Sequence, residues 1–278
     1  MGASIILHLA KKFSTLQPFH GRVSVLLDVD EHSGRFGGVK RFLEETNKKP
    51  DHVLIAYPDN NQVNIGARGF LRVEVVARGE AAHSGGIRTR GINAVSDLSQ
   101  LISLLDLSEL PEETHDQFKF GPALTITKIS GGESFSQVPD SAFCEIDIRL
   151  TPSFDHEEAL NWLQGKIVEC SRSDRVKTDF KVNAIDYWPP YLVDSHDAFL
   201  ASLSKNAKKE FKCEIPQKVC GPSNIGNFLA AHGISTSTGL GVSYENLHAA
   251  NESACIADIA PVYNTYLFSA LEMLAIKL

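Results

Sequence analysis

The first and last parts of the chain share one style of apolar spacing, in which short apolar runs stand between helical segments. Residues 23–29 and 52–57 are almost continuously apolar and predict buried strands, and residues 37–47 between them have helical spacing. The same style returns after residue 188, with helices expected at 196–212, 224–232 and 262–277. Buried strands that alternate with helices predict a parallel α/β layer.

The middle of the chain shows strict alternation of apolar and polar residues. In residues 142–150, Cys144, Ile146 and Ile148 alternate with charged neighbours, which predicts a strand with one buried face. The whole segment reads as βαββαβ, the order of a ferredoxin-like unit. Its strands are expected at 71–75, 123–129, 142–150 and 176–185, and its helices at 91–105 and 156–170. We therefore expect an α/β domain of residues 1–67 and 188–278, interrupted by a ferredoxin-like domain at 68–187.

Composition narrows the class of protein. With 278 residues, 43% of them hydrophobic, the chain can bury an ordinary core, and its net charge of −7 argues against nucleic-acid binding. No apolar run approaches the roughly 20 residues that span a membrane. The helical spacing of residues 1–13 is interrupted by His8, Lys11 and Lys12, which is unlike a signal peptide. Five scattered cysteines without a CxxC pair predict reduced thiols and a cytoplasmic protein.

The sequence carries none of the P-loop, GxGxxG, HExxH and GxSxG motifs. The candidate catalytic and metal-binding residues lie instead in a few polar segments. Asp28-Val29-Asp30-Glu31-His32 ends the first apolar run, where α/β sheets bind ligands and where an imidazole can hold a metal. The alternative is that the same residues form an acidic turn in contact with solvent and bind no ligand. His83 and His248 are candidate ligands or surface histidines. Arg149 is a candidate anion ligand or a member of a surface ion-pair ladder.

Taken together and in order, these segments resemble the M20 family of co-catalytic zinc peptidases and deacylases. The family includes carboxypeptidases, dipeptidases, acetylornithine deacetylase and succinyl-diaminopimelate desuccinylase. The resemblance covers nearly the whole chain. It implies an α/β catalytic-type domain that binds one or two zinc ions, with an inserted ferredoxin-like lid through which two copies form a homodimer.

The resemblance assigns the metal chemistry to two segments. Asp30-Glu31-His32-Ser33-Gly34 resembles the family's Asp-Glu-Glu-x-Gly, so that Glu31 falls on the general base for a metal-bound water and His32 on a metal ligand. His248, in Leu-His-Ala-Ala-Asn-Glu, falls on the last ligand of the same metal. Tyr57 stands where the family carries an acidic ligand, and Asp59 is a possible substitute.

Other segments resemble the family's substrate-binding motifs. Ala82-His83-Ser84-Gly85 and Gly91-Ile92-Asn93-Ala94 look like the lid signature, which implies that His83 steadies the oxyanion across the dimer and that Asn93 contacts substrate. Arg149 resembles the arginine that pairs with a substrate carboxylate. Gly221 and Ser223 lie in a segment that resembles a substrate loop, Gly221-Pro222-Ser223-Asn224.

The start of the chain departs from the family. The first zinc ligand and the bridging Asp of the family would fall before Met1. Two hypotheses about activity therefore stay open. In the first, the chain hydrolyses amide bonds in peptides or N-acyl amino acids that carry a carboxylate. In the second, it is an inactive, N-terminally truncated homologue that acts as a dimeric binding or relic protein. Neither hypothesis involves nucleic acid or a membrane.

Overall fold

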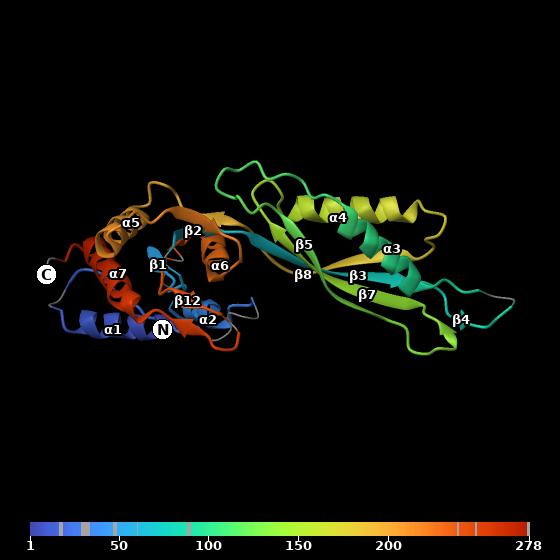
Figure 1. Cartoon of the computed structure of the whole chain (residues 1–278), viewed down its shortest axis with the longest axis horizontal. Helices are drawn as coiled ribbons and strands as arrows, with labels where there is room; N and C mark the ends of the chain where they lie inside the picture. Colours follow the sequence, from blue (N-terminus) through green and yellow to red (C-terminus); the bar gives the residue numbers. More distant parts are fainter. Residues whose placement is uncertain are drawn as a thin grey trace. The chain divides into compact units, whose positions relative to one another are not determined.

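The chain folds into two compact units. The structure is a computed structural model and describes residues 1–16, 19–28, 34–46, 49–59, 61–87, 90–237, 239–247 and 249–276. One unit, the inserted unit, is Arg68–Pro190, and the other, the split unit, combines Met1–Ala67 with Tyr191–Leu278 (Figure 1). The expected junctions near residues 67 and 188 lie close to these boundaries. The α/β fold with an inserted ferredoxin-like unit is confirmed.

The inserted unit is built on a four-stranded antiparallel sheet in the order β5-β7-β3-β8. Both of its helices lie on the same side of that sheet (Figure 1). The chain order is strand, helix, strand, strand, helix, strand, with bounds β3 (Gly69–Arg78), α3 (Ala94–Leu107), β5 (Ala123–Gly131), β7 (Ser141–Leu150), α4 (His156–Ser171) and β8 (Asp179–Trp188). A separate two-stranded ladder joins β4 (Ala82–His83) to β6 (Gln137–Val138).

The two faces of this sheet differ sharply. On the helix side, Val73 of β3, Ile146 of β7 and Leu98 of α3 are completely or almost completely buried in one apolar core. Because successive strand residues point to opposite faces, the residues between the buried ones lie on the other side. That second side, which we call the open face, carries mainly polar side chains. It includes Phe70, Arg72 and Glu74 of β3 and Glu145, Asp147 and Arg149 of β7.

The split unit has shorter strands, two to five residues long. β1 (His52–Leu54) pairs with β11 (Ser235–Ser237), and β2 (Val63–Ala67) pairs with β10 (Gln217–Cys220), both in parallel as the sequence predicts. β9 (Tyr191–Leu192) adds to β2, and β12 (Tyr244–Glu245) pairs with β13 (Ser253–Ala254), both antiparallel. The helices are α1 (Gly2–Ser14), α2 (Gly37–Thr46), α5 (Ala198–Phe211), α6 (Ile225–Ala231) and α7 (Ile259–Met273), the last preceded by a 3₁₀ turn, Ile256–Asp258.

The strand expected at residues 23–29 is wrong as far as those residues are described. Residues 22–28 form no strand, and Val23, Leu26 and Leu27 are exposed, Leu27 to 54%. An apolar run becomes a buried strand only where another strand pairs with its backbone and another layer covers its side chains. Neither condition is met for residues 22–28 among the parts of the chain that the structure describes.

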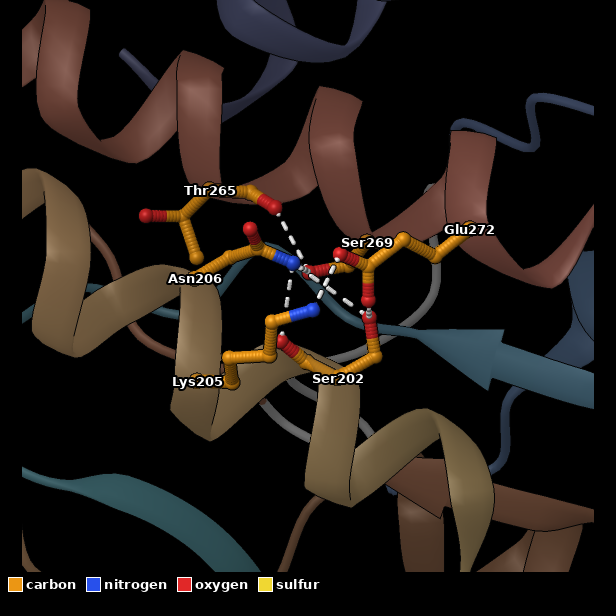
Figure 2. Close-up of polar contacts among 6 residues, drawn as sticks. All are labelled: Ser202, Lys205, Asn206, Thr265, Ser269 and Glu272. Carbon is orange, nitrogen blue, oxygen red and sulfur yellow. Dashed lines mark hydrogen bonds and ion pairs between the residues drawn. The ribbon is translucent and has the colours of Figure 1, made fainter. Parts of the chain in front are cut away.

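A polar network joins α5 to α7 inside the split unit (Figure 2). The buried Asn206 donates through Nδ2 to the Ser202 carbonyl at 3.0 Å and reaches the Ser269 hydroxyl at 3.3 Å. Glu272 accepts from Ser202 Oγ at 2.6 Å and lies 2.8 Å from Lys205 Nζ. The hydrogen bonds from Lys205 and Ser202 lower the pKa of Glu272, which keeps this carboxylate ionised.

Candidate functional site

The expected catalytic base and metal ligands are in segments that the structure does not describe. Glu31, His32 and His248 all lie outside the described residues. Within the part of the chain that is described, no three His, Cys, Asp or Glu side chains are grouped to hold a metal ion. The hydrogen bonds and ion pairs that the structure gives are therefore those of the residues expected to contact substrate.

His83 lies on an exposed turn of the inserted unit, at the end of β4. The Gly85 amide donates a hydrogen bond to His83 Nδ1 at 3.0 Å. Since Nδ1 accepts, the neutral ring carries its proton on Nε2. The turn is held to the facing segment by the Ser84 amide, which donates to the Ser136 carbonyl at 2.9 Å. The arrangement presents Nε2–H as a hydrogen-bond donor, which is what an oxyanion requires.

Asn93 has a structural role in addition to any contact with substrate. It is the N-cap of α3, and its Oδ1 accepts from the Ser96 amide at 3.0 Å. Gly91 before it has φ of +66°, and a Cβ there would lie 2.5 Å from the Glu80 carbonyl oxygen. Helix capping and a close backbone approach thus explain why Gly91 and Asn93 stand at these positions. The cap uses one lone pair of Oδ1 and does not involve the Nδ2 group.

Arg149 lies on the open face and contacts its own strand neighbour. Its Nε is 2.8 Å from Asp147 Oδ1, and Arg72 Nε on the adjacent strand is 3.5 Å from Asp147 Oδ2. This is the ion-pair ladder that the sequence left open as one alternative. Sequence reasoning did not select Arg72 or Asp147 as site residues. The sequence shows the alternation of polar and apolar residues in both strands. It does not show the register that places Arg72 opposite Asp147.

Gly221 and Ser223 lie between β10 and α6, in the split unit. Gly221 is buried and Ser223 half-buried. The loop is fixed by Asn224, whose Oδ1 caps α6 by accepting from the Gly226 amide at 2.8 Å. Asn224 Nδ2 also donates to Cys220 Sγ at 3.3 Å. The asparagine therefore suits the local hydrogen bonding of the loop.

Asp59, the possible substitute for an acidic metal ligand, is engaged in a turn. Its Oδ1 accepts from the Asn61 amide at 3.1 Å and from Asn61 Nδ2 at 2.7 Å. Its φ of +84° is a conformation that aspartate tolerates better than most residues. The Tyr57 carbonyl oxygen lies so close to Gly241 that a Cβ there could not fit. The contacts of Asp59 with Asn61 thus form a turn, and the segment also packs against residues 241–242.

Comparison with known proteins finds one family model that matches part of the chain. Residues 65–172 match the peptidase dimerisation domain of the M20 family. Carboxypeptidase G2 of a Pseudomonas strain is 25% identical over 59% of this chain and 39% of its own length. A succinyl-diaminopimelate desuccinylase of Parvibaculum lavamentivorans is 22% identical over 90% of this chain and 64% of its own length. The chain thus spans less than two thirds of the length of these curated relatives.

Solved structures show the same fold. The aminopeptidase PepT of Bacillus cereus superposes with a TM-score of 0.73 at 19% identity, over 99% of this chain and 70% of its own. An M20 family metallo-carboxypeptidase of Sulfolobus solfataricus gives 0.65 at 20% identity, over 96% and 73%. None of the described helices is long and apolar enough to cross a membrane. The chain is therefore similar to M20 metallopeptidases and deacylases in sequence and fold, and residues 65–172 match the peptidase dimerisation domain.

Proposed function

We propose that the chain serves as a metal-dependent hydrolase of amide bonds in peptides or N-acyl amino acids. The observation that carries the proposal is the His83 turn, which lies inside the segment matching the M20 dimerisation domain and presents an Nε2–H donor. The relatives named carboxypeptidase and succinyl-diaminopimelate desuccinylase support the same reaction class.

The donor types at the expected metal site fit zinc. His32 and His248 offer imidazole nitrogens, which are among the usual zinc ligands, and Glu31, next to His32 in the sequence, offers a carboxylate. Bound zinc would supply a Lewis acid that polarises the carbonyl and lowers the pKa of a water molecule. We also propose that the protein is cytoplasmic and that its cysteines are reduced.

The chain's own residues then have distinct tasks. Glu31 takes the proton of the attacking water as general base. His83 donates from Nε2 to the carbonyl oxygen as negative charge develops there. Arg149 holds a substrate carboxylate, with Asn93, Gly221 and Ser223 as further polar contacts. Hydrolysis of one amide bond releases one carboxylic acid and one amine.

The proposal is tested by hydrolysis of N-acetylated amino acids and dipeptides after zinc is supplied. We expect turnover that Glu31→Gln lowers by about 10²- to 10⁴-fold, because a positioned general base contributes about that much. Zinc content should be unchanged in that variant. No turnover with any of these substrates at full zinc loading would contradict the proposal and favour the binding or relic role.

We further propose that two copies associate through the inserted unit and that His83 serves the partner's site. The match to a dimerisation domain and the exposure of His83 support this. If His83 acts across the dimer, mixing inactive Glu31→Gln and His83→Ala chains restores activity, because the mixed dimer holds one complete site. Sedimentation should give a dimer for all three proteins. Failure of the mixture to recover activity despite exchange of subunits would contradict action across the dimer.

A further inference from the structure

We propose that Phe135 is a specificity-determining residue whose ring contacts the acyl group of the substrate and favours acyl groups that are apolar and uncharged. This inference rests on the proposed function, which places His83 at the carbonyl of the amide bond but leaves the acyl group open. It narrows the substrate class to amino acids that carry an apolar N-acyl chain. The hydrogen bonds that hold Phe135 beside His83 carry the inference.

Two turns lie next to each other at the end of the inserted unit, His83–Gly86 and Ser134–Gln137, and we call them the double turn. In the first turn the last amide donates to the first carbonyl at 2.8 Å, and in the second turn the same bond measures 3.4 Å. His83 and Gln137 are cross-strand partners in the ladder of β4 and β6, beyond the end of β3 (Figure 1). The ladder therefore sets the two turns side by side.

Ser84 joins the first turn to the second through its backbone and its side chain. Its amide donates to the Ser136 carbonyl at 2.9 Å, and its hydroxyl donates to the Phe135 carbonyl at 3.0 Å. Within the second turn, the Ser136 amide donates to Ser134 Oγ at 3.3 Å. The residue that follows His83 is thus bonded directly to the backbone of Phe135. These bonds hold Phe135 beside His83.

The ring of Phe135 is fully exposed although its backbone is held in place. Phenylalanine is among the side chains that proteins bury most often, and a turn needs only residues such as the serines on either side of it. Ile87, directly after the first turn, is 97% exposed. The double turn thus presents two large apolar side chains that its own hydrogen bonds do not require.

An apolar ring beside a hydrogen-bond donor matches the composition of a substrate site. Such sites combine apolar and aromatic side chains with a few polar groups that orient the ligand. His83 offers its Nε2–H to the carbonyl oxygen, and the acyl chain is bonded directly to that carbonyl carbon. A ring held beside His83 is therefore placed to contact the acyl chain. It favours an apolar chain, because a carboxylate that leaves water to meet a ring loses hydration without gaining a partner.

The test compares N-butyryl-L-alanine with N-succinyl-L-alanine, whose acyl chains are equally long and end in a methyl group and a carboxylate. With zinc supplied, we expect the full chain to hydrolyse the butyryl compound with a kcat/KM about tenfold or more above the succinyl compound. N-acetyl-L-alanine, shorter by two methylenes, should be about 5- to 15-fold below the butyryl compound, because each buried methylene contributes a factor of roughly four. A preference for the succinyl compound, or equal values for the acetyl and butyryl compounds, would overturn the proposal.

Variants of Phe135 show whether its ring produces the preference. Phe135→Ala should lower the butyryl-to-acetyl ratio by about fivefold, and Phe135→Leu should keep much of the ratio. Phe120→Ala is the matched control, because that ring is 66% exposed in the same unit but precedes β5, whereas the second turn follows this strand of nine residues. The control should keep the native ratio.

An unchanged ratio in Phe135→Ala, or an equal loss of the ratio in the Phe120→Ala control, would overturn the proposal. So would a loss of rate in Phe135→Ala that is the same for all three substrates and comes with a weaker dimer in sedimentation. That result would assign the ring to a contact between subunits.

Binding separates this inference from the proposed function. In the Glu31→Gln chain, calorimetry measures binding of the butyryl and acetyl compounds without turnover. The tighter binding of the butyryl compound should be lost when Phe135→Ala is added. That pattern, in a chain whose native form shows no turnover with zinc, would remove the proposed function and leave the acyl contact. Turnover in the native chain without a preference among the acyl groups would remove the acyl contact and leave the proposed function.

Discussion

The inserted unit and the split unit achieve stability in different ways. The inserted sheet has four strands of nine or ten residues that pair along most of their length, and two helices cover one of its faces. The split unit has strands of two to five residues and relies more on helix packing, including the α5–α7 pair with its polar network. The first unit has a continuous apolar layer between its sheet and its helices, and the second has several small sheets of two or three strands among the described residues.

This contrast matters for the proposed function because the inserted unit carries three of the proposed substrate contacts, whereas the split unit carries the proposed metal ligands together with Gly221 and Ser223. His83, Asn93 and Arg149 belong to the inserted unit, where backbone pairing and helix capping fix them. Glu31, His32 and His248 belong to the split unit and lie outside the described residues. We therefore expect the carboxylate-binding property to be separable from metal binding.

The largest effect is expected in the core of the inserted unit. Leu98 on α3 is completely buried, so Leu98→Ala should lower the free energy of unfolding by about 2–5 kcal/mol. The matched control is Leu107→Ala on the same helix, where the side chain is 84% exposed. The control should stay within about 0.5 kcal/mol. Urea denaturation followed by circular dichroism measures both, and equal losses would contradict a continuous core.

A second prediction concerns the backbone before α3. Gly91→Ala should cost about 1–3 kcal/mol, because φ is +66° and the added Cβ would lie 2.5 Å from the Glu80 carbonyl oxygen. Gly165→Ala in the middle of α4 meets no atom within 4 Å and should instead stabilise the protein by about 0.5–1 kcal/mol. Thermal unfolding of the two variants should therefore shift in opposite directions. Shifts of the same sign would show that Gly91 is not under steric constraint.

The third prediction extends the comparison to the split unit. Asn206→Ala removes the hydrogen bonds that its amide makes to Ser202 and Ser269 and should cost about 0.5–1.5 kcal/mol. Asn264, which is half-buried and donates to Glu210 between the same two helices, provides the control. A smaller loss is expected for Asn264→Ala in the same urea titration. The reverse order would mean that the buried network does not hold α5 to α7.

The smallest effect is the pH dependence of Glu272. Its pKa is lowered from 4.5 by hydrogen bonds from Lys205 and Ser202. A carboxyl with a lowered folded pKa stabilises the fold above its unfolded pKa and loses that contribution as the pH falls through the folded value. The advantage of the native chain over Glu272→Gln should thus be full near pH 6 and vanish well below pH 4.5. It should stay below about 1 kcal/mol, because the side chain is 40% exposed. An advantage that grows on acidification would contradict this.

The inserted fold could be predicted well because one-sided burial leaves a regular signal. The alternation in residues 142–150 became β7, and the helix expected at 156–170 became α4 with only small changes at its ends. The split unit was harder. Residues 63–67 form β2, buried at every position, but Asn64 and Gly66 break its apolar pattern. Residues 23–29 had the strongest apolar pattern of this unit, yet the described ones form no strand.

The site shows a similar limit. Motif order selected His83, Asn93 and Arg149, and their placement on a turn, a helix cap and a strand follows from local rules. The tautomer of His83 and the pairing of Arg72 with Asp147 depend on a backbone amide and on strand register. The spacing of residues within one segment determines neither the tautomer nor the pairing. The sequence therefore indicated which residues belong to the site but not which atoms they contact.

The most direct test of metal-dependent hydrolysis is the metal content of the full chain after dialysis against trace zinc, measured by mass spectrometry beside a His248→Ala control. We expect about one zinc ion per chain, which is lost in the control because an imidazole ligand is removed. A chain that retains no zinc, or a His248→Ala variant that keeps as much as the native chain, would contradict it.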